Sequence, residues 1–296
     1  MMGYLLLLAA TFLNIAKSYS TKRISGRVEN FSETVDVSLF RNLLCALIGA
    51  VLVAAGGFES FRMPPLGWLI CTVSGIAVGI NYIVWVLALK SGVYMFASAV
   101  NSASFILAAL CGILFFGERL TLPKGIAILL ILLAILFMGK YQSQARGKVA
   151  PMHALYLLLV FVTAGGTSAT QKWFTLSLPH VSVHTFSFYS LLISVPILAA
   201  MTFFIPNRPP IKKRLGTVKA LFPWIAVMAV CLYAVTYLQT AASALLEAIV
   251  MYPLYNGSLL VAGSLMAWLC FSEKPNRNSI IGVILVFSAV VLFGLS

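Results

Sequence analysis

Charged residues are scarce in this sequence, and their scarcity excludes a soluble globular domain of ordinary composition. Aspartate, glutamate, lysine and arginine make up 9% of the 296 residues, whereas soluble domains carry about 25%. Hydrophobic residues make up 61%, and the mean hydropathy is +1.02. A single core of this length cannot hide so much apolar surface from water. We therefore expect the lipid bilayer to be the solvent for most of the chain.

The sequence also lacks the motifs of common enzymes and metal proteins. It has no phosphate-binding loop of the kind that drives ATP-dependent pumps, no HExxH and no metal-spaced histidine and cysteine cluster. The five cysteines lie inside apolar runs without CxxC spacing, so we interpret them as small buried hydrophobic residues. A membrane-embedded transferase would need acidic residues or histidines at useful spacings, and we find none. We expect no enzyme activity, no cofactor and no metal.

The formal net charge is +13, which by itself suggests a nucleic-acid partner. The basic residues, however, fall between apolar runs rather than on one face, so we predict no nucleic-acid binding. No basic segment with a small-residue cleavage site precedes Lys17, which argues against a removable signal peptide.

Long apolar runs are what the sequence has in abundance. A spanning helix needs about 20 mostly apolar residues, and the runs give ten candidates. They cover residues 3–20, 37–57, 62–90, 90–118, 122–139, 148–172, 172–208, 219–247, 247–273 and 278–295. The runs are continuously apolar and do not alternate, so we predict an all-α helical bundle rather than a barrel. The count falls to nine if the first run lies in the membrane interface.

A short phrase occurs twice along the chain. Residues 115–121 read FFGERLT at the end of the fourth run, and residues 270–276 read CFSEKPN at the end of the ninth. A shift of 155 residues aligns Glu118 with Glu273. A helix–charge–helix unit that recurs at this distance indicates a chain built from two halves.

The same shift pairs Asn101 with Asn256, and polar residues are rare enough here for this to carry weight. We therefore predict two five-helix repeats, residues 1–146 and 147–296. Because five is odd, the second repeat enters the membrane from the opposite side, which makes the repeats inverted. Substrate sites in such folds lie near the midplane between the halves.

Uncharged polar and aromatic residues form stripes at helical spacing within several runs. A single stripe is more often a contact between helices than a site. Stripes on corresponding segments of both halves favour a shared polar cavity, and its aromatic residues suit a flat or amphipathic solute. The residues that we expect to line it are Asn81, Trp85, Asn101, Tyr237, Tyr252 and Asn256.

Lys17 and Arg41 are charged residues within predicted spans. Such a residue costs at least about 2.5 kcal/mol on insertion scales, so it usually faces a cavity or a partner. Lys17 has the simpler explanation that it reaches back to the headgroups. Arg41 has Asp36 as its only carboxylate nearby in sequence, and a bond to helix-end carbonyls explains it as well as a substrate does. We keep both as candidates that meet a substrate carboxylate at the entrance.

None of the seven acidic residues falls in the middle of a predicted span. A proton- or sodium-coupled carrier often uses a carboxylate there, so coupling stays open, and facilitated exchange or export fits equally. We interpret His184 and Glu247 as helix-end residues. Glu118 and Glu273 are expected to be structural, each stabilising the N-terminus of the helix that follows it.

The sequence resembles the EamA module of the drug/metabolite transporter superfamily. The residues that carry the resemblance are Ala88-Leu89-Lys90, the small-residue run through Asn101, and residues 116–121, FGERLT. Arg41 is similar to an arginine often seen in the second span. The resemblance covers nearly the whole chain and is weaker in the second half, where residues 272–275 read SEKP in place of GERL.

The resemblance implies a five-plus-five plan and a monomer or loose homodimer that exports or exchanges amino acids, nucleosides, sugar phosphates or drugs. A GxxxG pattern at Gly75–Gly79 permits close helix approach and is only weak support for a dimer. We expect a multi-pass secondary transporter of the cell membrane that moves a small metabolite by alternating access, with the solute and membrane lipid as partners. A channel or a non-transporting scaffold is the alternative.

The orientation of the chain stays open. Fourteen basic residues on one side against four on the other place both termini outside by the positive-inside rule. The resemblance implies cytoplasmic termini instead.

Overall fold

The computed structural model describes residues 1–296 except 92–93, 147–149, 206–208, 273–274 and 295–296. Within this part of the chain the regular elements are helices, and there is no strand. The helices are α1 (Met2–Ser25), α2 (Phe31–Ala55), the 3-10 helix η1 (Phe58–Phe61), α3 (Pro65–Ser91), α4 (Tyr94–Ala103), α5 (Phe105–Phe115), α6 (Leu122–Arg146), α7 (Pro151–Ser177), α8 (Val183–Phe203), α9 (Ile211–Leu245), α10 (Ala248–Phe271) and α11 (Arg277–Gly294).

Eight apolar helical stretches in the described residues are long enough to cross a membrane. Helices α6 and α11 add two shorter apolar stretches, Leu122–Met138 and Arg277–Ala289. Large apolar side chains also lie on the outside of the bundle, where Leu47 is 63% exposed and Leu114 is 70% exposed. Exposed apolar surface of this kind requires lipid as its solvent. The protein is a multi-pass membrane protein, as the apolar runs predicted.

The fourth apolar run differs from the single span that we predicted, because it is broken at Ser104. Helix α4 ends at Ala103, and α5 begins at Phe105. At the break the Ser104 N–H donates to the Asn101 carbonyl at 3.1 Å, a spacing of three residues in place of four. Helix α7 comes very close here, since a Cβ added to Gly165 would lie 2.7 Å from the Ser104 carbonyl oxygen.

Helices α2 and α9 begin earlier than their apolar runs predicted. Helix α2 begins at Phe31 rather than near residue 37, and α9 begins at Ile211 rather than near residue 219. Polar residues near the starts of these two helices meet, and the Arg214 guanidinium forms an ion pair with the buried Asp36 carboxylate. The pair stabilises helical structure beyond the apolar part of each segment.

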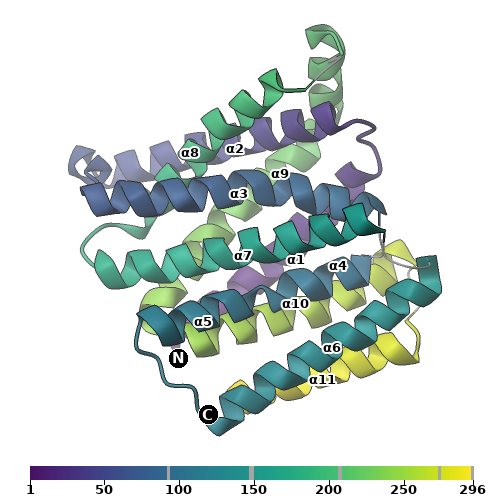
Figure 1. Cartoon of the computed structure of the whole chain (residues 1–296). Helices are drawn as coiled ribbons and strands as arrows, with labels where there is room; N and C mark the ends of the chain where they lie inside the picture. The colour runs from purple at the N-terminus through teal and green to yellow at the C-terminus, as the bar shows by residue number, and fades with distance from the viewer. Residues whose placement is uncertain (92–93, 147–149, 206–208, 273–274, 295–296) are drawn as a thin grey trace.

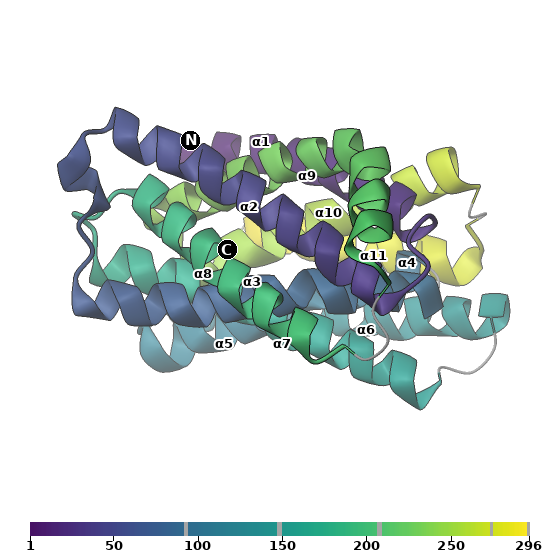
Figure 2. The same cartoon turned by 90° about the horizontal axis from the view of Figure 1, so that it is seen from above.

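The helices form a bundle in which segments far apart in sequence lie side by side (Figure 1). Helix α1 packs along α9, α3 along α7, α2 along α8 and α6 along α11. Each of these pairings joins the first half of the chain to the second. Helix α10 packs on α4, α11 and α1, and α4 also packs on α6 and α7. In Figure 1, α4 and α10 accordingly lie between α1 and α7 above and α6 and α11 below, and Figure 2 shows the same bundle from above.

The GxxxG pattern of α3 brings that helix close to α8 within the same chain. A Cβ added to Gly75 would lie 2.8 Å from the Ser190 carbonyl oxygen, and one added to Gly79 would lie 3.5 Å from the Ser194 Cβ. The absence of a side chain at Gly75 therefore serves packing between α3 and α8, whereas Gly79 has room for a Cβ.

Candidate functional site

A polar cavity of about 160 Å³ lies between helices from both halves of the chain. Its walls come from α1, α2, α3, the broken α4–α5 segment, α7, α9 and α10. Amide, aromatic and cationic side chains share the lining, and the main ones are Asn14, Asn81, Asn101, Gln171, Gln239, Asn256, Tyr82, Trp85, Tyr94, Tyr255, Lys17 and Arg41. No carboxylate is among the described residues that line it.

Most of the residues predicted to line a central site do lie on this cavity. The six are Asn81, Trp85, Asn101, Asn256, Lys17 and Arg41. They come from α1, α2, α3, α4 and α10, so the fold brings together residues that are up to 239 positions apart in the sequence. Their role in binding a solute stays a prediction.

Tyr237 and Tyr252 lie elsewhere. The Tyr237 ring stacks on the His184 ring with centroids 4.1 Å apart. Tyr252 is fully buried, and its hydroxyl donates to the Ser168 carbonyl at 2.6 Å. The polar residues of α9 that line the cavity are instead Thr236 and Gln239. Adjacent helical positions differ by about 100°, and the apolar sequence around them does not show which of two neighbouring faces turns inward.

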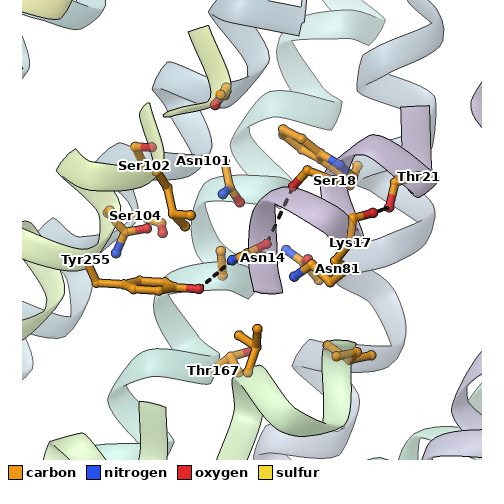
Figure 3. A pocket seen from close by; sticks show the side chains of 18 of the residues that line it. Asn14, Lys17, Ser18, Thr21, Asn81, Asn101, Ser102, Ser104, Thr167 and Tyr255 are labelled. Carbon is orange, nitrogen blue, oxygen red and sulfur yellow. Dashed lines mark hydrogen bonds between the residues drawn. The ribbon is translucent and has the colours of Figure 1, made fainter. Parts of the chain in front are cut away.

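Asn14, Gln239 and Tyr255 are lining residues that the sequence prediction left out. Asn14 and Lys17 are three positions apart on α1, which places them on one face of that helix. This spacing from Lys17 could have predicted Asn14 as a lining residue. The Asn14 amide donates to the Tyr255 hydroxyl and thereby links α1 to α10, and Figure 3 draws this bond as a dashed line between the two side chains.

The amides in the cavity differ in how much of their hydrogen-bonding capacity is already used. Asn81 donates to the Thr163 hydroxyl at 2.9 Å, which ties α3 to α7. Asn256 donates to the carbonyl of Tyr252 on its own helix at 2.9 Å. Asn101 has no side-chain hydrogen bond within the described residues. Its amide is therefore the most available of the three for a solute.

Arg41 is 4% exposed and held in place by neutral groups. Its Nε donates to the Asn42 amide oxygen at 2.8 Å, and its guanidinium lies 4.1 Å from the centre of the Tyr82 ring. Asn42 in turn donates to the Ser194 hydroxyl at 2.7 Å. Asp36, the carboxylate that the sequence offered to Arg41, is instead paired with Arg214. The Asp36–Arg214 pair joins α2 to α9 and leaves Arg41 without a carboxylate partner within the described residues.

Glu118 is structural in the structure, as predicted, but it acts on a different helix from the one expected. Its two carboxylate oxygens accept the backbone N–H groups of Ala248 and Ile249, each at 2.8 Å. These groups begin α10, so Glu118 caps a helix 130 residues later in the chain rather than α6, which follows it. A carboxylate at this place satisfies free donors and complements the helix dipole. Its counterpart Glu273 lies outside the described residues.

Lys172 completes this arrangement at the junction between α9 and α10. Its ammonium lies 3.6 Å from the Glu118 carboxylate and donates to the carbonyls of Ser243 and Leu246 at 3.1 and 2.8 Å. Those carbonyls belong to the end of α9. Glu118 and Lys172 therefore hold the start of α10 and the end of α9, respectively.

His184 and Glu247 lie near helix ends, where the sequence placed them, and neither lines the cavity. The His184 Nδ1 is 3.1 Å from the Tyr233 hydroxyl oxygen. Glu247 is half-exposed and pairs with the buried Lys124 at 3.1 Å. Among the described residues there is no group of three or more histidine, cysteine, aspartate or glutamate side chains placed to hold a metal.

Comparison with known proteins relates part of this sequence to a family. The model of the EamA-like transporter family matches residues 1–140. An "Uncharacterized transporter in cobO 3'region" of Sinorhizobium sp is 28% identical over 100 residues, which are 33% of this chain and 70% of the relative. A crystal structure of another protein aligns with this chain with a TM-score of 0.69 at 16% identity. The alignment covers 99% of this chain and 96% of the other chain. That likeness shows the fold alone.

The protein is therefore a multi-pass membrane protein whose first half is similar to the EamA-like transporter family. The match over residues 1–140 confirms the resemblance that the sequence shows in its first half.

Proposed function

We propose that the protein is a secondary transporter that moves a small metabolite through the polar cavity by alternating access, in export or exchange. The observation that carries the proposal is a polar cavity walled by helices of both halves of the chain. Rocking of one half against the other would open such a site to each side of the membrane in turn. Amino acids, nucleosides and similar amphipathic solutes suit the mix of amides and aromatic rings.

The proposal includes ten spans in two inverted five-helix repeats, residues 1–146 and 147–296. The eight long and two shorter apolar stretches support the count when α4 and α5 are taken as one broken span. The packing also supports the repeat. In the proposed repeats α1 corresponds to α7, α2 to α8 and α3 to α9, and each contact between two helices recurs between their counterparts. Helix α1 packs along α9 as α7 packs along α3, and α2 packs on α9 as α8 packs on α3.

The break at Ser104 supports a transport role for the cavity. Ser102, Ser104 and Asn101 surround the break, and all three line the cavity. Interrupted helices in transporters often supply the groups that bind substrate, because irregular backbone is tolerated in a membrane only against protein or water. A channel would use the same cavity without closing it, and a scaffold would not use it at all.

Uptake into liposomes tests the proposal. Purified protein is reconstituted and offered a labelled panel of amino acids, nucleosides and small organic acids over a range of concentrations. A transporter gives saturable uptake, whereas a channel gives uptake that rises linearly with concentration, and a scaffold gives none.

Two asparagine variants of the same protein locate the site. Asn101→Ala is expected to raise the half-saturating concentration roughly 3- to 10-fold, as loss of one neutral hydrogen bond predicts. Asn256→Ala is the matched control and should have the smaller effect, because its amide already donates to its own helix. Equal half-saturation in Asn101→Ala and the unmodified protein would remove Asn101 from the site.

A further inference from the structure

The cavity holds two positive charges and no negative one within the described part of the chain. Lys17 and Arg41 both line it, from α1 and α2. Buried charge of this kind is costly unless an opposite charge or a set of hydrogen bonds compensates it.

The described carboxylates of the bundle do not supply the missing charge. Asp36 is taken by Arg214, Glu118 by Lys172 and Glu247 by Lys124. Glu59 pairs with Arg62 at the surface, and Glu33 accepts the backbone N–H of Glu29 at 2.9 Å. None of them lines the cavity.

The contacts of Arg41 fix its guanidinium in an orientation that leaves donors for an anion. Its Nε donates to the Asn42 amide oxygen, and the Asn42 amide in turn donates to the Ser194 hydroxyl on α8. The Tyr82 ring covers one side of the guanidinium. These contacts fix the group while its two Nη atoms have no hydrogen bond within the described residues. A planar fork with two free donor nitrogens matches a carboxylate or phosphate group.

Lys17 adds a second cationic donor to the cavity lining. No hydrogen bond or ion pair of its ammonium exists among the described residues. The remaining lining is neutral, with Asn14, Asn101 and Gln239 able to donate to or accept from the rest of a solute. No carboxylate is at hand in this lining to receive an ammonium group, so a cationic solute has no counter-charge here.

We infer that the solute is a small organic anion, whose carboxylate or phosphate group binds between Lys17 and Arg41 while the amides hold its neutral part. This inference rests on the proposed function and sharpens it by naming the charge of the substrate. The volume of about 160 Å³ fits a solute of only a few heavy atoms beyond the anionic group.

The test is binding to the whole protein in lipid nanodiscs, with two anions and their uncharged counterparts as probes. The probes are lactate with lactamide, and glycerol 3-phosphate with glycerol. Binding is read as the rise in unfolding temperature with ligand concentration. At least one anion should stabilise the protein while its neutral counterpart does not. Lactate alone identifies a carboxylate site, and glycerol 3-phosphate alone identifies a phosphate site.

Three variants assign the effect to the cavity. Lys17→Met removes the charge and keeps the length of the side chain, so it should weaken binding of the anion roughly 10- to 100-fold, as loss of a charged hydrogen bond predicts. Lys17→Arg keeps the charge and should retain most of the affinity. Lys219→Met removes an equal charge from an exposed position on α9 and should change nothing.

Equal binding of a neutral counterpart, binding of neither anion, or full affinity in Lys17→Met would each overturn the inference. The outcome is separable from that of the proposed function. Saturable uptake of neutral solutes alone would leave the transporter and remove the anion site. Anion binding without any saturable uptake would keep the site and remove transport.

Discussion

Glu118→Gln is expected to lower the free energy of unfolding by about 3–5 kcal/mol, the usual cost of removing one partner of a buried ion pair. The Glu118 side chain is 7% exposed and that of Lys172 is 8% exposed, so solvent does not screen the loss. The substitution leaves the Lys172 ammonium without its counter-charge and gives the two N–H groups of α10 one oxygen in place of two. Unfolding in detergent, followed by intrinsic fluorescence, measures the change.

Glu59→Gln is the matched control for this prediction. Glu59 and Arg62 form an ion pair at 2.9 Å whose side chains are 77% and 81% exposed. Exposed pairs contribute less than about 1 kcal/mol, so the control should unfold almost like the unmodified protein. Equal shifts in the two variants would mean that the buried pair does not stabilise the junction of α9 and α10. Because Glu118 does not line the cavity, solute preference in Glu118→Gln should change little.

Gly75→Ala is expected to destabilise the protein by about 1–3 kcal/mol, as overpacking of a tight contact does. The new Cβ would lie 2.8 Å from the Ser190 carbonyl oxygen and 2.9 Å from the Ile193 Cγ2. The first of these atoms belongs to the backbone of α8 and cannot turn away, so α3 and α8 must separate. The measurement is again the unfolding midpoint of the purified variant.

Gly79→Ala makes the same chemical change one helical turn later and serves as its control. Its Cβ would lie 3.5 Å from the nearest atom, which is an ordinary contact. Alanine favours a helix over glycine by roughly 0.5–1 kcal/mol, so this variant should be neutral or slightly stabilised. If both variants behaved alike, close packing of α3 on α8 would not be the reason for the GxxxG pattern.

The sequence predicted the helices well because membrane insertion depends on local composition. Long runs without charge have few alternatives to a helix in lipid. The places where prediction failed depend on packing between distant segments. The start of α2 near Phe31 depends on Arg214, and the break at Ser104 lies where α7 approaches at Gly165. The sequence of an apolar run does not show which distant residue will pack against it, so neither Arg214 nor Gly165 could be predicted as a partner.

The candidate site shows the same division. Asn101, Asn81 and Trp85 were predicted from rare polar or aromatic positions on a repeated plan, and they line the cavity. Tyr237 was predicted from an equally good stripe on α9, yet that face turns toward His184. Glu118 was correctly predicted to stabilise a helix N-terminus, but the wrong helix was expected. It caps α10, in the other half of the chain, rather than α6, which follows it in sequence.

Counterflow tests the central claim of alternating access most directly. Liposomes that contain the protein are loaded with an unlabelled solute that the uptake assay has identified, and entry of the labelled solute is then followed. A transporter is expected to show faster initial entry into loaded than into empty liposomes, with a transient accumulation above the outside concentration. Entry that is linear in concentration and no faster into loaded liposomes would contradict alternating access and indicate a channel.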